Sequence, residues 1–111
     1  MTVTTEDLAE GITRVVMDGR LDIAGAAAVD LKMNVIAGSK SRVLLDMQKV
    51  SFLGSMGLRS IVIPAQTVHR RGGKVVIFAP AEMVESVLKA SGIDTLIPIR
   101  HELADALAAL Q

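Results

Sequence analysis

The stretch VLLDMQKVSFLGSMGL, residues 43–58, contains the change from a strand pattern to a helix pattern that decides the fold. Its apolar first part ends in Asp46 and is typical of a strand that is covered on both faces of a sheet. A loop is expected over 47–54, and from Met56 onward apolar residues recur at helical spacing. The stretch therefore predicts a buried strand, a loop and a helix that begins beside a serine, Ser55.

Strand and helix patterns alternate on both sides of this stretch. Two short strands around Glu10 and Gly11 predict an antiparallel hairpin. In the first helix, Leu31 and Val35 belong to the recurring apolar residues, Asp22 is expected to cap the N-terminus, and Gly38 is expected at the C-terminal end. The expected strands are 2–8, 11–18, 42–46, 74–79 and 95–99, and the expected helices are 23–38, 55–70, 80–92 and 100–110.

The order β-β-α-β-α-β-α-β-α predicts an α/β fold. Strand-helix-strand units place their strands parallel in one sheet, and the hairpin adds an antiparallel strand at one side. Pro98 confines the last strand to an edge, and Pro64 predicts that the second helix bends or ends early. We expect a single domain over residues 1–111, with a mixed, mostly parallel sheet of four or five strands packed against about four helices.

Composition excludes several classes of function. The chain has 12 basic and 12 acidic residues and only two aromatics, so neither a field for phosphate backbones nor a stacking surface for bases is expected. It has no cysteine, and its histidines and carboxylates lack metal-ligand spacing, so no metal or cofactor is expected. The first residues lack a signal-peptide pattern and no apolar run is long enough to span a bilayer, which predicts a cytoplasmic protein without membrane insertion.

Ser55 has three interpretations. As an N-cap, its oxygen would accept a hydrogen bond from the Leu58 amide. As a phosphorylation site, it would place the phosphate against unpaired amides and the positive end of the helix dipole, with Arg59 one turn away. As a catalytic nucleophile, it would need a base, and His101 with Asp94 or Asp105 is the candidate that spacing allows.

The nucleophile interpretation has little support in the sequence. A nucleophile elbow requires glycine two residues before and two residues after the serine, but only Gly57 fits and Leu53 occupies the other position. His69 lies at the far end of the same helix, about 20 Å away by helix rise. No glycine-rich phosphate loop with a lysine is present. The chain is therefore expected not to be an enzyme, and no catalytic residue is assigned.

Three segments together resemble the STAS domains, and among them the single-domain anti-sigma factor antagonists. DGRLDIAGAAAVD, residues 18–30, is similar to the family's Gly-x-Leu-Asp turn into the first helix. Residues 43–58 are similar to its hallmark, an Asp-ended strand followed by Val-x-Phe and Asp-Ser-Ser/Thr-Gly-Leu. RRGGKVVIFAPAEMVESVLKASGIDTLIPI, residues 70–99, is similar to its Gly-Gly strand, Pro-led helix and Ser-Gly ending. The resemblance covers nearly the whole chain and agrees with the order of elements above.

The resemblance implies a partner switch in bacterial transcription regulation and signal transduction. In such proteins the unphosphorylated domain binds an anti-sigma factor that is also a serine kinase of the GHKL-ATPase type. The kinase phosphorylates the hallmark serine, the complex is lost, and a PP2C-type phosphatase reverses the modification. By this resemblance Ser55 is the phosphoacceptor and Asp46 the supporting acid that ends the strand.

The same resemblance implies which residues meet the partner. They surround the serine and are Gly54, Met56, Gly57, Leu58 and Arg59. Gly57 and Leu58 match the hallmark, whereas Gly54 stands in place of the usual acid and Met56 in place of the second Ser/Thr. These departures leave open an alternative function, a constitutive STAS subunit of a transport or lipid-trafficking complex without phospho-regulation.

Overall fold

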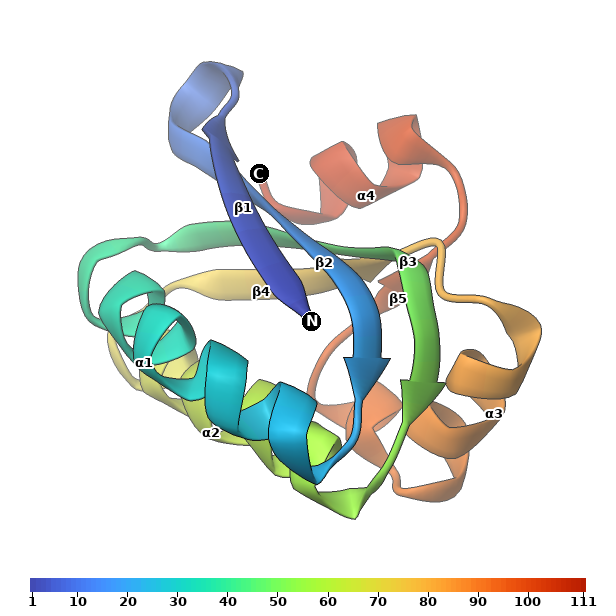
Figure 1. Ribbon diagram of the computed structural model, residues 1–111. Helices are drawn as coiled ribbons and strands as arrows, with labels where there is room; N and C mark the ends of the chain where they lie inside the picture. The colour runs from blue at the N-terminus through green and yellow to red at the C-terminus, as the bar shows by residue number, and fades with distance from the viewer.

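Five strands form one sheet in the spatial order β1-β2-β3-β4-β5 (Figure 1). The computed structural model describes residues 1–111. β1 pairs antiparallel with β2, and all other neighbouring strands are parallel. The strands are β1 (Thr2–Asp7), β2 (Ile12–Leu21), β3 (Arg42–Leu53), β4 (Lys74–Phe78) and β5 (Ile99–Arg100). The predicted mixed, mostly parallel sheet with a hairpin at one side is confirmed.

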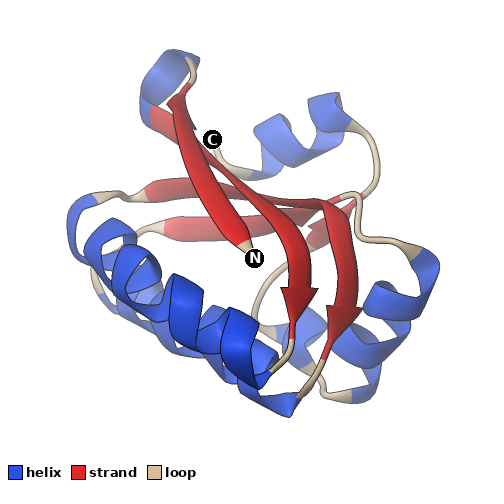
Figure 2. Ribbon diagram, viewed as in Figure 1, coloured by secondary structure: helices blue, strands red, loops and turns tan.

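Helices cover both faces of the sheet (Figure 2). The helices are α1 (Ile23–Ser39), α2 (Ser55–Arg70), α3 (Glu82–Ala90) and α4 (Leu103–Ala109), with short 3-10 turns at Ala9–Gly11 and Ile93–Thr95. The main core contains 22 buried residues and joins α1, α2 and α3 to one face of the sheet. A smaller cluster of six buried residues joins α4 to the other face. None of the helices combines the length and apolar character needed to cross a membrane.

The third strand is longer than predicted, because a β-bulge lets it continue through the expected loop over 47–54. Val16 pairs with Asp46 and Asp18 pairs with Lys49, so two steps along β2 correspond to three along β3. A bulge bends a strand and increases its twist. The bend is visible where β2 and β3 turn together toward the start of α2 (Figure 1). The apolar pattern of the sequence did not predict that β3 continues, because the bulge interrupts the alternation of buried and exposed residues.

Asp46 stabilises the bulge. Its Oδ1 accepts a hydrogen bond from the backbone N–H of Gln48 at 3.0 Å, and its Oδ2 lies 2.5 Å from Nη2 of Arg14. The carboxylate is buried, with 3% of the side chain exposed, whereas Arg14 keeps 27%. A buried charge requires such partners because its desolvation is otherwise uncompensated. Asp46, which ends the predicted strand, therefore stabilises the sheet at the bulge.

Two glycines allow the N-termini of α1 and α2 to approach the end of β2. A Cβ atom on Gly57 would lie 2.5 Å from the carbonyl oxygen of Leu21 and 2.7 Å from its Cβ. A Cβ on Gly25 would overlap the carbonyl oxygen of Arg20. Both helix starts are therefore packed against the same short piece of backbone, and larger residues at these positions would push the helices away.

Asp22 caps α1 as predicted. Its Oδ1 accepts a hydrogen bond from the backbone N–H of Gly25 at 2.8 Å. This bond, together with the Arg20 guanidinium, holds the pKa of the Asp22 carboxyl below its usual value against an opposing contribution from desolvation. The ionised carboxylate also favours the positive end of the helix dipole. Protonation of the Asp22 carboxylate therefore weakens the cap and lowers the stability of α1.

The far ends of α1 and α2 differ from expectation. Gly38 does not end α1, which continues to Ser39 with Lys40 as its C-cap. Pro64 does not shorten α2, because the helix runs unbroken from Ser55 to Arg70 with the proline buried inside it. The proline ring lines a small void together with Met33 of α1.

Two further expectations are corrected. Leu31 and Val35 are 75% and 62% exposed, because the buried face of α1 is turned away from them. That buried face consists of Gly25, Ala26, Val29, Met33, Ile36 and Ala37. The expected strand over 95–99 is reduced to two residues, Ile99–Arg100, because Ile93–Thr95 forms a 3-10 turn.

Gly57→Ala is expected to destabilise the protein by about 2 kcal/mol, because the added methyl group overlaps the Leu21 backbone. Gly38→Ala is the matched control, since it is also helical but has nothing within 4 Å of the added atom. The control is expected to gain about 0.5–1 kcal/mol from helix propensity. Urea unfolding measures both free energies, and a Gly57→Ala protein as stable as Gly38→Ala would contradict the packing described.

Asp46→Ala is expected to cost about 3 kcal/mol, because it leaves Arg14 and the Gln48 amide without their acceptor. Asp18→Ala removes an exposed carboxylate of β2 that forms no ion pair, and about 0.5 kcal/mol or less is expected. Unfolding free energies from urea titrations test the difference. Equal losses in the two variants would show that Asp46 does not support the bulge.

Asp22 is expected to make stability depend on acid pH. Because its folded-state pKa is lowered, its contribution is present above the unfolded value of about 3.9 and is lost as the pH falls through the folded value. Asp22→Asn keeps a capping oxygen but does not titrate. The difference in urea midpoint between the two proteins should therefore shrink as the solution is acidified. A difference that stays constant with pH would exclude this linkage.

Candidate functional site

Ser55 is the first residue of α2 and is exposed. The N-cap is Gly54, in extended conformation with φ −104° and ψ −179°, and its carbonyl accepts the Leu58 amide at 3.0 Å. The structure contradicts the interpretation of Ser55 as the N-cap. The cause is one residue upstream, where the Gly54 N–H donates to the Leu21 carbonyl at 3.0 Å and sets the position at which the helix starts.

The beginning of α2 carries no side-chain cap. The first amides of a helix have no acceptor within the helix, and they give its N-terminus a partial positive charge. Ser55 is the first residue at this end, and its side chain is exposed. The local field therefore favours negative charge on this residue.

An open depression of about 340 Å³ adjoins the serine. Two segments form it, the corner between β2 and α1 and the junction between β3 and α2. The parallel pairing of Arg20 with Phe52 and of Leu21 with Leu53 brings these segments together. The lining residues are Arg20, Asp22, Ile23, Phe52, Gly54, Ser55 and Met56.

The depression combines exposed apolar side chains with one cation. Ile23, Phe52 and Met56 are 75%, 40% and 40% exposed, and all three line the same depression. The guanidinium carbon of Arg20 lies 4.5 Å from the centre of the Phe52 ring, within the range of a cation–π interaction. Arg20 Nε also lies 3.5 Å from Oδ2 of Asp22. This surface offers apolar contact and a positive charge next to the Ser55 hydroxyl.

The sequence did not identify Arg20, Ile23 or Phe52 as site residues. Arg20 lies within the segment GRLD and Phe52 within VSFLG, and both segments resemble the STAS pattern. Their meeting depends on the register between β2 and β3, including a second irregularity between Gly19 and Arg20. A short-range sequence pattern cannot predict the register between these two strands.

The predicted site residues divide into three groups. Gly54 and Met56 adjoin Ser55 in the depression, as expected from their positions. Gly57 is buried against Leu21 and Leu58 is half-buried, so their main contacts are internal. Arg59 is exposed, but it lines a second hollow.

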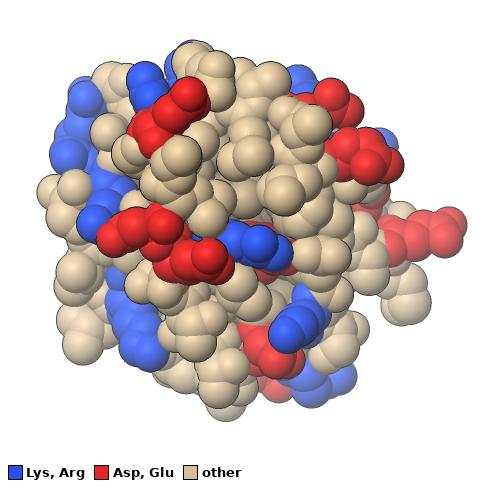
Figure 3. Space-filling model, turned by 90° about the horizontal axis from the view of Figure 1, so that it is seen from above, with Lys and Arg blue, Asp and Glu red and all other residues tan.

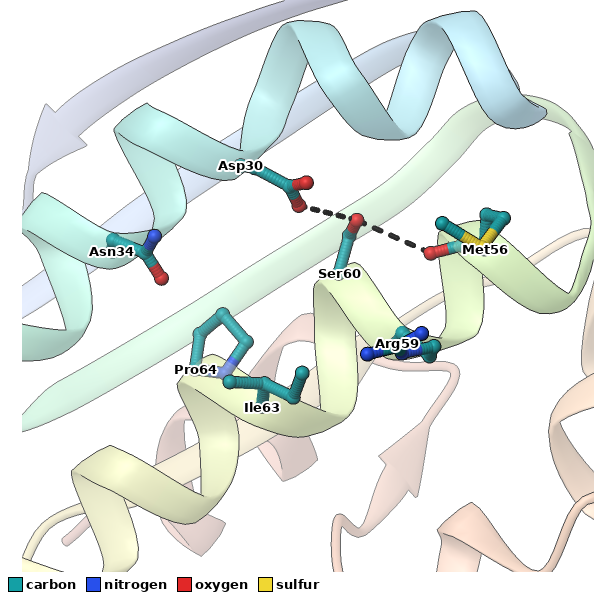
Figure 4. A pocket seen from close by; sticks show the side chains of 7 residues that line it. All are labelled: Asp30, Asn34, Met56, Arg59, Ser60, Ile63 and Pro64. Carbon is teal, nitrogen blue, oxygen red and sulfur yellow. Dashed lines mark hydrogen bonds between the residues drawn. The ribbon is translucent and has the colours of Figure 1, made fainter.

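That second hollow, of about 220 Å³, lies between α1 and α2 (Figure 4). Arg59 and Met56 line it from α2, and Asp30 and Asn34 from α1. The buried Ser60 hydroxyl lies 2.6 Å from Oδ1 of Asp30 and 3.2 Å from the Met56 carbonyl, which ties the two helices together. Met56 borders both hollows.

Asp46 does not lie in the same place as Ser55. It lies nine residues earlier in the chain, in the part of β3 where it pairs with Phe78 of β4. Phe78 belongs to the cluster beneath α4, on the sheet face opposite α2. The supporting acid of the predicted site thus acts through the sheet and does not touch the serine.

No base is placed for a nucleophilic serine. His101 Nε2 lies 2.6 Å from Oε1 of Glu85, between the β5–α4 connection and α3. The histidine and Lys89 hold the pKa of Glu85 below its usual value. No group of three or more His, Asp or Glu side chains is arranged for a metal ion. Acidic and basic residues are interspersed on the face in Figure 3, without a broad region of one sign.

Comparisons with known proteins identify the family of the chain. The model of the STAS domain matches residues 6–106. The anti-sigma-F factor antagonist RsfB of Mycobacterium tuberculosis is 25% identical over 112 residues, covering 100% of this chain and 90% of the relative. The crystal structure of an anti-sigma factor antagonist from Mycobacterium paratuberculosis has a TM-score of 0.86 and 27% identity, covering 98% of this chain and 92% of that one.

The fold is also shared with a more distant protein, the Bacillus cell fate determinant SpoIIAA in its phosphorylated form. The TM-score is 0.74 at 14% identity, covering 99% of this chain and 100% of that one. The family match extends over most of the chain and includes the strand, bulge and helix that present Ser55. The resemblance stated from the sequence is confirmed, and the chain belongs to the STAS domain family.

Proposed function

We propose that this protein is an anti-sigma factor antagonist whose partner binding is controlled by phosphorylation of Ser55. The observation that carries the proposal is the exposed Ser55 hydroxyl at the uncapped start of α2, beside a depression with three exposed apolar side chains. Relatives named anti-sigma factor antagonists, RsfB among them, support it. In this function the chain is a binding module and catalyses no reaction itself.

In the unphosphorylated state, the partner covers the depression and the start of α2. Met56 and Arg59 are accessible to it, whereas Gly57 and Leu58 hold α2 in place. Gly54 keeps the surface beside the serine free of a side chain. Burial of the exposed apolar groups favours the complex by about 25 cal/mol for each Å² removed from water.

Phosphorylation changes this surface without disturbing the fold. A kinase would transfer the γ-phosphoryl group of ATP to Ser55 Oγ, so that an O–P bond forms, ADP leaves, and the hydroxyl proton passes to a base of the kinase. The helix amides and dipole accept the added charge of about −2. A partner that buried this phosphate without compensation would lose several kcal/mol of binding free energy, about tenfold in affinity for each 1.4 kcal/mol.

We propose that two classes of enzyme add and remove the phosphate, because the family resemblance implies them. An anti-sigma factor with GHKL-type kinase activity is both the partner and the enzyme that modifies Ser55. A PP2C-type phosphatase removes the phosphate and restores binding. Phosphorylated SpoIIAA, which has the same fold, supports the compatibility of this fold with the modification.

Ser55→Ala is expected to bind the anti-sigma factor whether or not ATP is present, and Ser55→Asp to bind at least tenfold more weakly, since a charge replaces the hydroxyl. Ser86→Ala and Ser86→Asp are matched controls at an exposed helical serine and should bind as the wild type does. Calorimetric titration with the purified anti-sigma kinase encoded nearest to this gene measures the affinities.

Intact-mass analysis after incubation with that kinase and ATP is expected to show one added phosphate, located on Ser55. An unmodified protein, together with a Ser55→Asp variant that binds as tightly as wild type, would reject the switch. Equal binding of all variants to a transport or lipid-trafficking complex would instead identify the chain as a constitutive subunit.

A further inference from the structure

Arg20 has unused hydrogen-bond donors beside Ser55. A guanidinium group carries five N–H donors in a planar fork. Only Nε approaches a carboxylate, Oδ2 of Asp22 at 3.5 Å, and no hydrogen bond engages the two terminal nitrogens. The side chain is 60% exposed and stacks at 4.5 Å over Phe52, which lines the same depression as Ser55. The arginine is therefore held at this place with its terminal donors available to a second anion.

Position 54 controls this availability. A Cβ atom on Gly54 would lie 3.2 Å from Cε2 of Phe52 and 3.7 Å from the Leu21 carbonyl oxygen. A side chain at this position would thus project toward the ring over which Arg20 stacks. A carboxylate there would pair with Arg20 and would also repel a phosphate on the next residue. Glycine at position 54 leaves the two terminal nitrogens of the guanidinium without a partner.

We propose that Arg20 binds the phosphate group of phosphorylated Ser55 through its terminal guanidinium nitrogens, and that Gly54 keeps Arg20 free for this contact. The inference rests on the proposed modification of Ser55 and names the residue that responds to it. The phosphate then changes two features of the surface at once, because it adds negative charge and withdraws the exposed arginine from the partner. Arg20 pairs with the phosphate in two parallel hydrogen bonds, which lysine cannot form.

Arg59 is the competing candidate, since it lies one turn after Ser55 on the same helix. Its side chain lines the hollow between α1 and α2 with Asp30 and Ser60 (Figure 4). The depression beside Ser55 is lined by Arg20 and not by Arg59. Substituting each arginine in turn therefore shows which of the two contacts the phosphate.

The test uses phosphoserine inserted genetically at position 55 of the full chain, so that no kinase is needed. The second pKa of the phosphate, ordinarily about 6, is measured by ³¹P NMR in low salt. Arg20→Gln is expected to raise it by about half a unit, because an exposed ion pair is lost. Arg20→Lys should raise it less, Arg59→Gln should leave it within about 0.1 unit, and Gly54→Asp should raise it by about half a unit.

A titration of Arg20→Gln that matches the unsubstituted phosphoprotein would overturn the inference, and so would an equal or larger shift in Arg59→Gln. Amide NMR spectra confirm that each variant keeps its fold. The outcome is independent of the proposed function, because the phosphate is installed without a kinase. If the Arg20 effect is found while the phosphoprotein still binds the anti-sigma factor tightly, the partner switch fails and the phosphate contact stands.

Discussion

The close contact of two helix starts with the last residues of β2 is the constraint on which the structure depends. Gly25 of α1 and Gly57 of α2 both lie against the Arg20–Leu21 backbone, at separations that no side chain would permit. The Leu21 carbonyl also accepts the Gly54 amide and so determines where α2 begins. The exposure of Ser55 follows from this contact. If α2 began one residue later, the serine would become its cap and its hydroxyl would be engaged.

Asp46 and Ser55 occur in one stretch of sequence but lie in different surroundings. Asp46 is buried, accepts the Gln48 amide and pairs with Arg14, so it holds the bulge that bends β3. The bend directs the strand toward the start of α2 (Figure 1). Asp46 thus influences Ser55 only through the course of the backbone, and the surface around the serine is made by other residues.

The surface around Ser55 joins three properties. Large apolar side chains are exposed, the first amides of a long helix are unpaired, and an arginine is stacked beside them with free donors. A protein partner can bury the apolar groups, whereas a phosphate can use the amides and the arginine. In the proposed switch the partner and the phosphate compete for this one surface. Gly54 matters here because a carboxylate in its position would take part in that competition.

Local chemistry in the sequence was sufficient for the elements, their order, the mixed sheet and the Asp22 cap, because apolar period, turn residues and capping oxygens act within a few residues. It also placed Ser55 next to a helix start. Only the tertiary structure decided that Gly54 is the cap, that β3 continues through a bulge to Leu53, and that Asp46 lies away from the serine. Arg20 and Phe52 joined the site for the same reason, since the register between two parallel strands is set by contacts far apart in the chain and leaves no local signal.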